Sequence, residues 1–253
     1  VAVERARAAT AEMAELARVG VVQAMSLTHE WNDELAQKVR DEECRVDRYE
    51  DALGTYLVKL SGRELNHTDS QSVNTLLHTI NDLERISDHS VNLLKAGQEI
   101  QEKSIHFSHE AIDDLSVLEA AVQDIVNRTV DAFQKNDCYA AGKIEPLEQV
   151  VDGLVREVKT RHIARLQAGA CTIEYGFVLD DLLTNYERIA DHCSNIAVAM
   201  IEVSEDRFDT HEYLNHIKNG ESPSFEKRYE RYRGRYTFEP GPSGTAAAPE
   251  QKK

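Results

Sequence analysis

The chain carries one short stretch twice, first as Glu84-Arg85-Ile86-Ser87-Asp88-His89-Ser90-Val91-Asn92 and again as Glu187-Arg188-Ile189-Ala190-Asp191-His192-Cys193-Ser194-Asn195. Both copies follow the pattern Glu-Arg-Ile-x-Asp-His-x-x-Asn, and 103 positions separate Glu84 from Glu187. An internal repeat of this length indicates two similar halves that share a core.

On a helix, the repeated motif stacks two carboxylates. Residues four apart lie on one face, one turn apart, so Glu84 lies beside Asp88 and Glu187 lies beside Asp191. Two like charges at this spacing repel by about 0.2–0.5 kcal/mol on an exposed helix, and by more when they are buried. A single acidic pair would more simply be a solvated helix face, but its repetition favours a bound cation.

A second pair of carboxylates recurs with nearly the same period. Glu43 and Asp47 lie four residues apart in one half, and Glu148 and Asp152 do the same 105 positions later. If each pair lies on the helix before its motif, the two helices of a hairpin supply four carboxylates to one site, as in helical bundles that bind metals. The predicted metal ligands are Glu43, Asp47, Glu84, Asp88, Glu148, Asp152, Glu187 and Asp191.

The predicted ligands are all oxygen donors, which limits the cation. Such a set suits magnesium, manganese, calcium or iron better than copper, and zinc stays open. The motif histidines are rotated by about 100° from the acidic face, so His89 and His192 are predicted to hydrogen-bond a neighbouring helix instead of binding the ion. Arg85 and Arg188 either neutralise carboxylates at the edge of the site or lie on the surface.

Composition and charge narrow the class of protein. The 253 residues are 41% hydrophobic and 29% charged, and only 12 glycines and 5 prolines interrupt them, which favours long helices. The net charge of −16 argues against a nucleic-acid partner, because Lys and Arg contacts dominate affinity for phosphate backbones. Cations or a basic protein surface are the expected partners. The four cysteines lack CxxC spacing, which fits free thiols in the reducing cytoplasm.

Six long helices are predicted, over residues 1–30, 34–61, 70–102, 108–136, 139–167 and 172–204. They define an all-α fold of two tandem antiparallel three-helix bundles with a C-terminal extension. The predicted domains are a first repeat at 1–103, a second repeat at 104–205, a basic and aromatic extension at 206–238, and a disordered tail at 239–253. The sequence has no signal peptide and no apolar run of ~18–20 residues that could span a membrane.

A two-fold repeat of three helices with Glu-x-x-x-Asp on the third helix of each half resembles the PhoU family of phosphate-signalling proteins. The resemblance covers residues 1–204 and is carried by Glu84 to Asp88 and Glu187 to Asp191, supported by Glu43 to Asp47 and Glu148 to Asp152. In that family such motifs bind multinuclear metal clusters on the bundle surface. This implies that the same eight carboxylates bind divalent or trivalent ions of iron, manganese, zinc or magnesium.

Residues 181–196 and 208–213 are similar, more specifically, to the C-terminal cytoplasmic PhoU-like domain of sodium/phosphate cotransporter family proteins. That resemblance implies a regulatory domain that controls phosphate uptake and is not an enzyme. Its expected partner is a membrane phosphate transporter, or a transmembrane part of its own chain from which this domain, which begins at Val1, has been excised. Its expected place is the cytoplasm, either free there or at the inner face of the cell membrane. The basic, aromatic segment 227–236 either packs on the bundle or meets the membrane or transporter.

Two other functions stay open from the sequence. A di-iron or di-manganese enzyme uses Glu-x-x-His, with the histidine three residues after the glutamate, whereas here the motif histidine follows the glutamate by five. A metal-free helical adaptor would use the same carboxylates in salt bridges with arginines of adjacent helices. The sequence lacks a Gly-rich phosphate loop, and it leaves open whether phosphate bridges bound metals and whether the chain forms a homo-oligomer.

Overall fold

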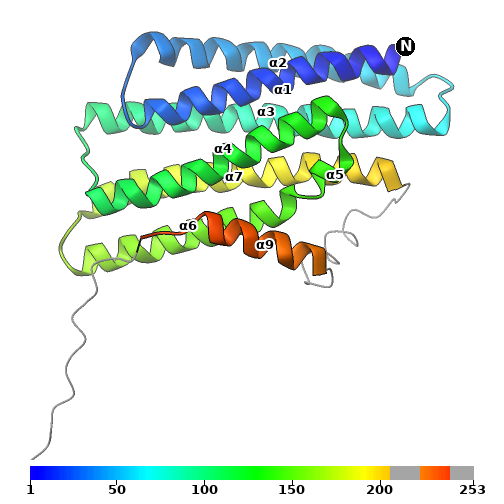
Figure 1. Cartoon of the computed structure of the whole chain (residues 1–253). Coiled ribbons are helices and arrows are strands. Elements are labelled where there is room, and N and C mark those ends of the chain that lie inside the picture. Colours follow the sequence, from blue (N-terminus) through cyan, green and yellow to red (C-terminus); the bar gives the residue numbers. More distant parts are fainter. Residues whose placement is uncertain (206–222, 240–253) are drawn as a thin grey trace, which may run out of the picture.

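The computed structural model describes residues 1–205 and 223–239, and this part of the chain contains helices and no strand (Figure 1). Its helices are α1 (Ala2–Leu27), α2 (Asp33–Ser61), α3 (His67–Glu102), α4 (His109–Lys135), α5 (Cys138–Ala141), α6 (Ile144–Gln167), α7 (Ile173–Glu205) and α9 (Pro223–Arg235). The predicted all-α class is confirmed. Among the described residues, no helix combines the length and apolar character that crossing a bilayer requires.

Polar side chains determine where several helices begin. The side-chain oxygens of Asn32, Asn66, Ser108 and Asp137 accept hydrogen bonds from the backbone N–H three residues further on, at the starts of α2, α3, α4 and α5. Each cap satisfies one N–H that has no partner within the helix and contributes about 1 kcal/mol. These caps explain why the predicted starts of α2, α3 and α4 lie within a few residues of the observed ones.

The single helix predicted over residues 139–167 is wrong, because the chain breaks after α5 and starts again at α6. A continuous helix would drive the ring of Pro146 into the carbonyl group of Gly142, four residues earlier. In the structure Pro146 is the third residue of α6, where its missing N–H costs nothing. The carbonyl oxygen of Gly142 instead accepts a hydrogen bond from Arg228 Nη1 of α9, at 2.8 Å.

Helices α1, α2 and α3 form one bundle, and α4, α6 and α7 form the other (Figure 1). The two helices that carry the repeated motif, α3 and α7, pack against each other in the middle of the molecule. One apolar core runs through both bundles and includes Leu93 of α3, Ile125 of α4 and Tyr186 of α7, all fully buried. Burying an aliphatic side chain of this size contributes about 1.5–3 kcal/mol. The two halves therefore share a core, as the repeat predicts.

Gly97 lets α3 pass the end of α1 at very short range. A Cβ atom added at this residue would lie 2.6 Å from the backbone oxygen of Leu27. No rotamer change can relieve that clash, because the opposing atom belongs to the main chain. At the equivalent position of the second repeat, 103 residues later, stands Met200, which is buried in the core. The two bundles therefore share a topology but pack differently in detail.

The C-terminal helix α9 packs on the second bundle, against α6 (Figure 1). Its residues Phe225 and Tyr232 are buried, and the hydroxyl group of Tyr236 donates to Asp124 Oδ2 of α4 at 2.7 Å. Of the two roles predicted for segment 227–236, packing on the bundle is the one observed. Residues 206–222 and 240–253, with nearly all of the tail predicted to be disordered, lie outside the described residues.

Candidate metal centres

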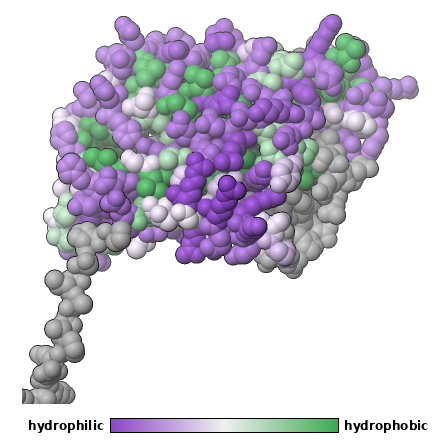
Figure 2. Space-filling view, in the orientation of Figure 1, coloured by the Kyte–Doolittle hydropathy of each residue, from purple (hydrophilic) through white to green (hydrophobic). Residues whose placement is uncertain are grey.

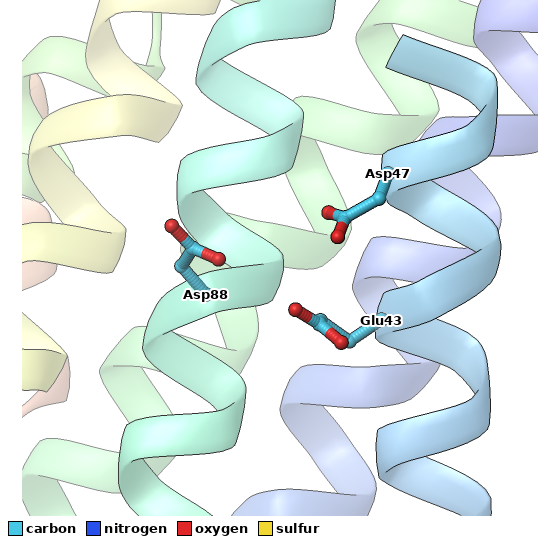
Figure 3. A group of neighbouring side chains, drawn as sticks. All are labelled: Glu43, Asp47 and Asp88. Carbon is cyan, nitrogen blue, oxygen red and sulfur yellow. The ribbon is translucent and has the colours of Figure 1, made fainter. Parts of the chain in front are cut away.

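Three carboxylates meet where α2 packs against α3. Glu43 and Asp47, one turn apart on α2, point toward Asp88 on α3 (Figure 3). Each residue offers an oxygen atom, and these atoms all lie within 4.8 Å of one another. We call Glu43, Asp47 and Asp88 the first cluster. It joins the two helices of one hairpin, which is the placement expected from the spacing of the acidic pairs.

The first cluster is costly to ionise without a cation. Burial, followed by repulsion from Asp47 and Asp88, raises the pKa of Glu43. Burial, followed by repulsion from Asp88 and Asp51, raises the pKa of Asp47. Burial and the charge of Asp88 raise the pKa of Glu84 from 4.5 to about 7. Without a cation, protons are therefore held here at pH values where carboxylates are normally ionised.

Glu84 stands beside the first cluster and is not a member of it. Its Oε2 atom lies 3.6 Å from Nε of Arg85, and Nη1 of the same arginine lies 3.6 Å from Oδ2 of Asp88. Arg85 therefore neutralises two carboxylates at the edge of the site, which is one of the two roles that the sequence left open for it.

The same arrangement recurs between α6 and α7. Glu148 and Asp152 of α6 and Asp191 of α7 each offer an oxygen within 4.8 Å of the others, and we call them the second cluster. Glu148 is only 4% exposed, so part of this cluster is shielded from water. Arg188 Nη1 lies 3.2 Å from Asp191 Oδ2, at the edge of the cluster. Glu187, which opens the motif, falls outside the group, as its counterpart in the first repeat does.

The donor atoms of the two clusters define what each can bind. Carboxylate oxygens are hard donors, and hard cations take six or more oxygen ligands, some of them from water. No histidine or cysteine belongs to either described group, so the donor set fits magnesium, manganese or iron better than copper. The histidine ligands typical of di-iron and di-manganese bundle enzymes are likewise not among these six residues.

The motif histidines meet across the contact between α3 and α7, where their rings stack with centroids 5.7 Å apart. His192 Nδ1 donates to Asp82 Oδ1 at 2.9 Å. His89 Nδ1 donates to Asn185 Oδ1 at 2.8 Å, because the amide nitrogen of Asn185 already donates to the backbone oxygen of Asp181. Each histidine bonds the helix that carries the other, which confirms the prediction that both hydrogen-bond a neighbouring helix.

Sequence reasoning missed the partners of these histidines and a buried polar network nearby. Asp82 and Asn185 are 103 positions apart, so the offset that relates the motifs would have revealed them.

The hydroxyl group of Tyr186 donates to Glu119 Oε1 at 2.6 Å, and His29 Nε2 lies 2.6 Å from the other oxygen of Glu119. Nothing in the sequence signals this network, because the first repeat has an apolar residue where the second has Tyr186.

Fold and site together define a class of protein: an all-helical two-fold repeat of three-helix bundles with a carboxylate cluster on corresponding hairpins. The model of the PhoU domain family matches residues 10–96 and 115–200, one match in each half. These matches cover more than half of the chain, and the chain belongs to the PhoU family. The domain limit between residues 103 and 104 stays a prediction.

Curated relatives and solved structures match over most of the chain. The phosphate-specific transport system accessory protein PhoU homolog 1 of Thermotoga maritima is 24% identical over 191 residues, which are 75% of this chain and 81% of that protein. The accessory protein PhoU of Serratia marcescens is 25% identical over 198 residues, 76% of this chain and 79% of that protein. The crystal structure of PhoU from Pseudomonas aeruginosa has the same fold, with a TM-score of 0.75 at 21% identity over 81% of this chain and 98% of that one.

Proposed function

We propose that this chain is a PhoU-type regulatory protein of phosphate transport whose two clusters bind metal ions. The observation that supports this most is the recurrence of one geometry. The first and second clusters occupy equivalent positions of the two repeats, at offsets of 103 or 105 residues, and each brings three carboxylates within 4.8 Å. Acidic surface residues without a role are not expected to converge twice at equivalent positions.

A bound cation would change the energetics of each hairpin. Without it, repulsion among three carboxylates acts to separate α2 from α3, or α6 from α7. A cation bound by oxygens of both helices neutralises this charge and links the helices. Because it binds the folded state only, it stabilises that state by mass action. The consequence is a stiffer bundle that presents a different surface to a partner.

We infer that the partner is a membrane phosphate transporter and that the role is regulatory, not catalytic. Relatives of this chain are named as accessory proteins of phosphate-specific transport systems. The resemblance of residues 181–196 to the cotransporter domain adds a more specific proposal, in which the transporter is a transmembrane part of the same protein. Either arrangement places the bundles at the cytoplasmic face of the membrane.

Elemental analysis of protein purified without a His tag or chelator tests the metal sites. Asp47→Asn with Asp88→Asn removes two ligands of the first cluster, and Asp152→Asn with Asp191→Asn does the same for the second. A matched control, Asp41→Asn with Asp180→Asn, removes two acidic groups outside the clusters, which interact with Gln37 and Lys159. We expect each test variant to lose the metal of one cluster and the control to keep both.

The opposite result would favour the metal-free adaptor. The proposal loses its basis if wild-type protein carries no metal after incubation with excess Mn²⁺ or Fe²⁺ and its Tm does not change. A metal that binds the native state must raise the stability of that state. The described contacts of Glu84 do not favour the adaptor. Glu84 pairs with Arg85, its own neighbour on α3, and not with an arginine of an adjacent helix.

A further inference from the structure

A basic groove runs between α9 and the junction of α4, α5 and α6, on a chain whose net charge is −16. Its volume is about 580 Å³, within the range of small-molecule sites. Figure 2 shows the most hydrophilic surface of this face gathered over α9. The groove takes six cationic side chains from both of its walls, namely Arg128, Lys143, Lys227, Arg228, Arg231 and Arg235.

Two of these six cations have a carboxylate partner. Asp124 lies 2.8 Å from Arg128 Nε and 3.7 Å from Arg235 Nη1, and it also accepts the hydroxyl hydrogen bond of Tyr236. The other four form no ion pair within residues 1–205 and 223–239: Lys143, Lys227, Arg228 and Arg231. Most of the positive charge of the groove is therefore not cancelled by the described part of the chain.

Uncharged groups hold several of these cations in place. Lys143 Nζ lies 4.1 Å and Arg228 Cζ lies 5.5 Å from the ring centre of Tyr139, and Arg128 Cζ lies 5.4 Å from that of Tyr232. The hydrogen bond from Arg228 to the Gly142 carbonyl fixes that side chain further. A ring or a carbonyl positions a cation without neutralising it. The groove is thus preorganised for an anionic ligand, and the described residues leave most of its positive charge uncancelled.

We propose that the basic groove binds a small soluble ligand that carries a chain of phosphoryl groups, such as an inorganic oligophosphate or a nucleoside polyphosphate. Arginine forks match phosphate oxygens with two hydrogen bonds each, and cations on facing walls suit several adjacent charges. An anionic membrane fits less well, since Phe225 and Tyr232, two apolar residues of α9 that could enter a bilayer, are both buried. The groove uses no residue of either carboxylate cluster, so this proposal does not depend on metal binding.

Isothermal titration calorimetry of the full chain in metal-free buffer tests the groove with tripolyphosphate, ATP and orthophosphate. The test variant is Lys227→Gln with Arg231→Gln, which removes two groove cations that form no ion pair with the described residues. The control is Lys59→Gln with Arg63→Gln, which removes the same charge from two exposed residues, one in the last turn of α2 and one just after its end. We expect the test variant to bind tripolyphosphate at least about tenfold more weakly and the control to bind it unchanged, because each lost cation removes charge-assisted hydrogen bonds.

Three results would overturn the proposal. The first is equal affinity of the test and control variants for tripolyphosphate and ATP. The second is orthophosphate binding as tightly as tripolyphosphate, which would exclude recognition of a phosphoryl chain. The third is binding to vesicles of phosphatidylserine and phosphatidylcholine without any binding of the soluble phosphates, which would assign the groove to the membrane. The proposal is supported if the test variant loses affinity for tripolyphosphate while the control keeps it, and if added salt weakens the binding of tripolyphosphate to the wild type.

Discussion

The two carboxylate clusters come from equivalent residues, yet they differ in their surroundings. In the first cluster the acidic side chains are all partly exposed to solvent, whereas Glu148 of the second is 4% exposed. Arg85 lies 3.6 Å from Glu84 as well as from Asp88, so one cation serves two carboxylates in the first repeat. In the second repeat the ion pair of Arg188 within the described residues is with a single carboxylate, that of Asp191.

This difference shows that the repeated spacing and the unrepeated neighbouring residues determine different properties of the two clusters. The repeated spacing determines which carboxylates meet, because it places them on the facing sides of paired helices. The residues around each motif, which are not repeated, determine how much water and counter-charge reach the site. Equivalent ligands in the two halves are therefore not equivalent in their electrostatics, and variants made in pairs can measure the difference.

The largest expected effect is on metal affinity. Asp88→Asn and Asp191→Asn each remove one carboxylate from one cluster and should weaken that site by more than about 100-fold, since even ligand-supporting residues outside the coordination shell contribute 10- to 100-fold. Titration calorimetry with Mn²⁺ on each variant would show one remaining class of sites. If either substitution empties both clusters, the two sites are coupled and the comparison of separate sites fails.

The second largest effect is on the free energy of unfolding, and it should differ between Tyr186 and Leu83, which occupy equivalent positions of the two repeats. Tyr186→Phe leaves an oxygen of Glu119 without its phenol donor and should lower the free energy of unfolding by about 1–3 kcal/mol. Leu83→Met, a swap of similar volume at the other position, should cost less than about 1.5 kcal/mol. Urea denaturation measures both.

The double variant Tyr186→Phe with Glu119→Gln refines that contrast. Its cost should be smaller than the sum of the two single costs, because the residues share one hydrogen bond. A Tyr186→Phe variant as stable as the wild type would show that the buried network does not stabilise the second repeat.

The third effect is a pH dependence that arises at Glu84, beside the first cluster. Because the fold raises the pKa of Glu84 from 4.5 to about 7, the folded state binds this proton more tightly than the unfolded chain does. The resulting stability is complete below about pH 4.5 and is lost as the pH rises through about 7. Solvent screening at this partly exposed site reduces the loss to about 1–2 kcal/mol.

Thermal unfolding of metal-free protein between pH 5 and pH 8 measures this loss, and Glu84→Gln should flatten the profile. Saturating Mn²⁺ should reverse the trend, since a cation competes with protons for the cluster. A Glu84→Gln variant that retains the wild-type slope would show that the proton is held elsewhere.

The smallest effect concerns the arginines at the cluster edges. Arg85→Gln and Arg188→Gln remove ion pairs of side chains that are 55% and 61% exposed, and each should change the free energy of unfolding by less than about 0.5 kcal/mol. In the metal-free state Arg85→Gln should have the larger effect, because it leaves two carboxylates unneutralised. Chemical denaturation at low salt resolves the two, and a larger effect of Arg188→Gln would contradict the comparison.

Much of the fold and part of the site follow from local sequence signals. The starts of three helices could be predicted because Asn32, Asn66 and Ser108 are favourable N-cap residues. The two similar halves could be predicted because the motif occurs twice. The break before Pro146 was missed because a proline in a first turn and a proline that kinks a helix look alike in sequence.

The sequence predicts the candidate metal site only in part. The spacing of four places Glu84 and Asp88 on one face, but it does not say which of them reaches across to α2. The structure brings Asp88 into the first cluster and leaves Glu84 beside Arg85. That choice depends on the rotation of α3 against α2, which is set by distant packing. The network of Tyr186, Glu119 and His29 joins α7, α4 and the turn after α1, and it leaves no periodic signal.

The crossed bonds of the two histidines also bear on the ancestry of the chain. In a symmetric dimer, residue i of one subunit meets residue j of the other, and j meets i in return. Here His89 meets position 185 and His192 meets position 82, which are the same pair of positions seen from the two repeats. A homodimer of one three-helix unit, joined by gene duplication and fusion, produces this pattern. The two copies differ at this position, since one histidine faces an aspartate and the other an asparagine.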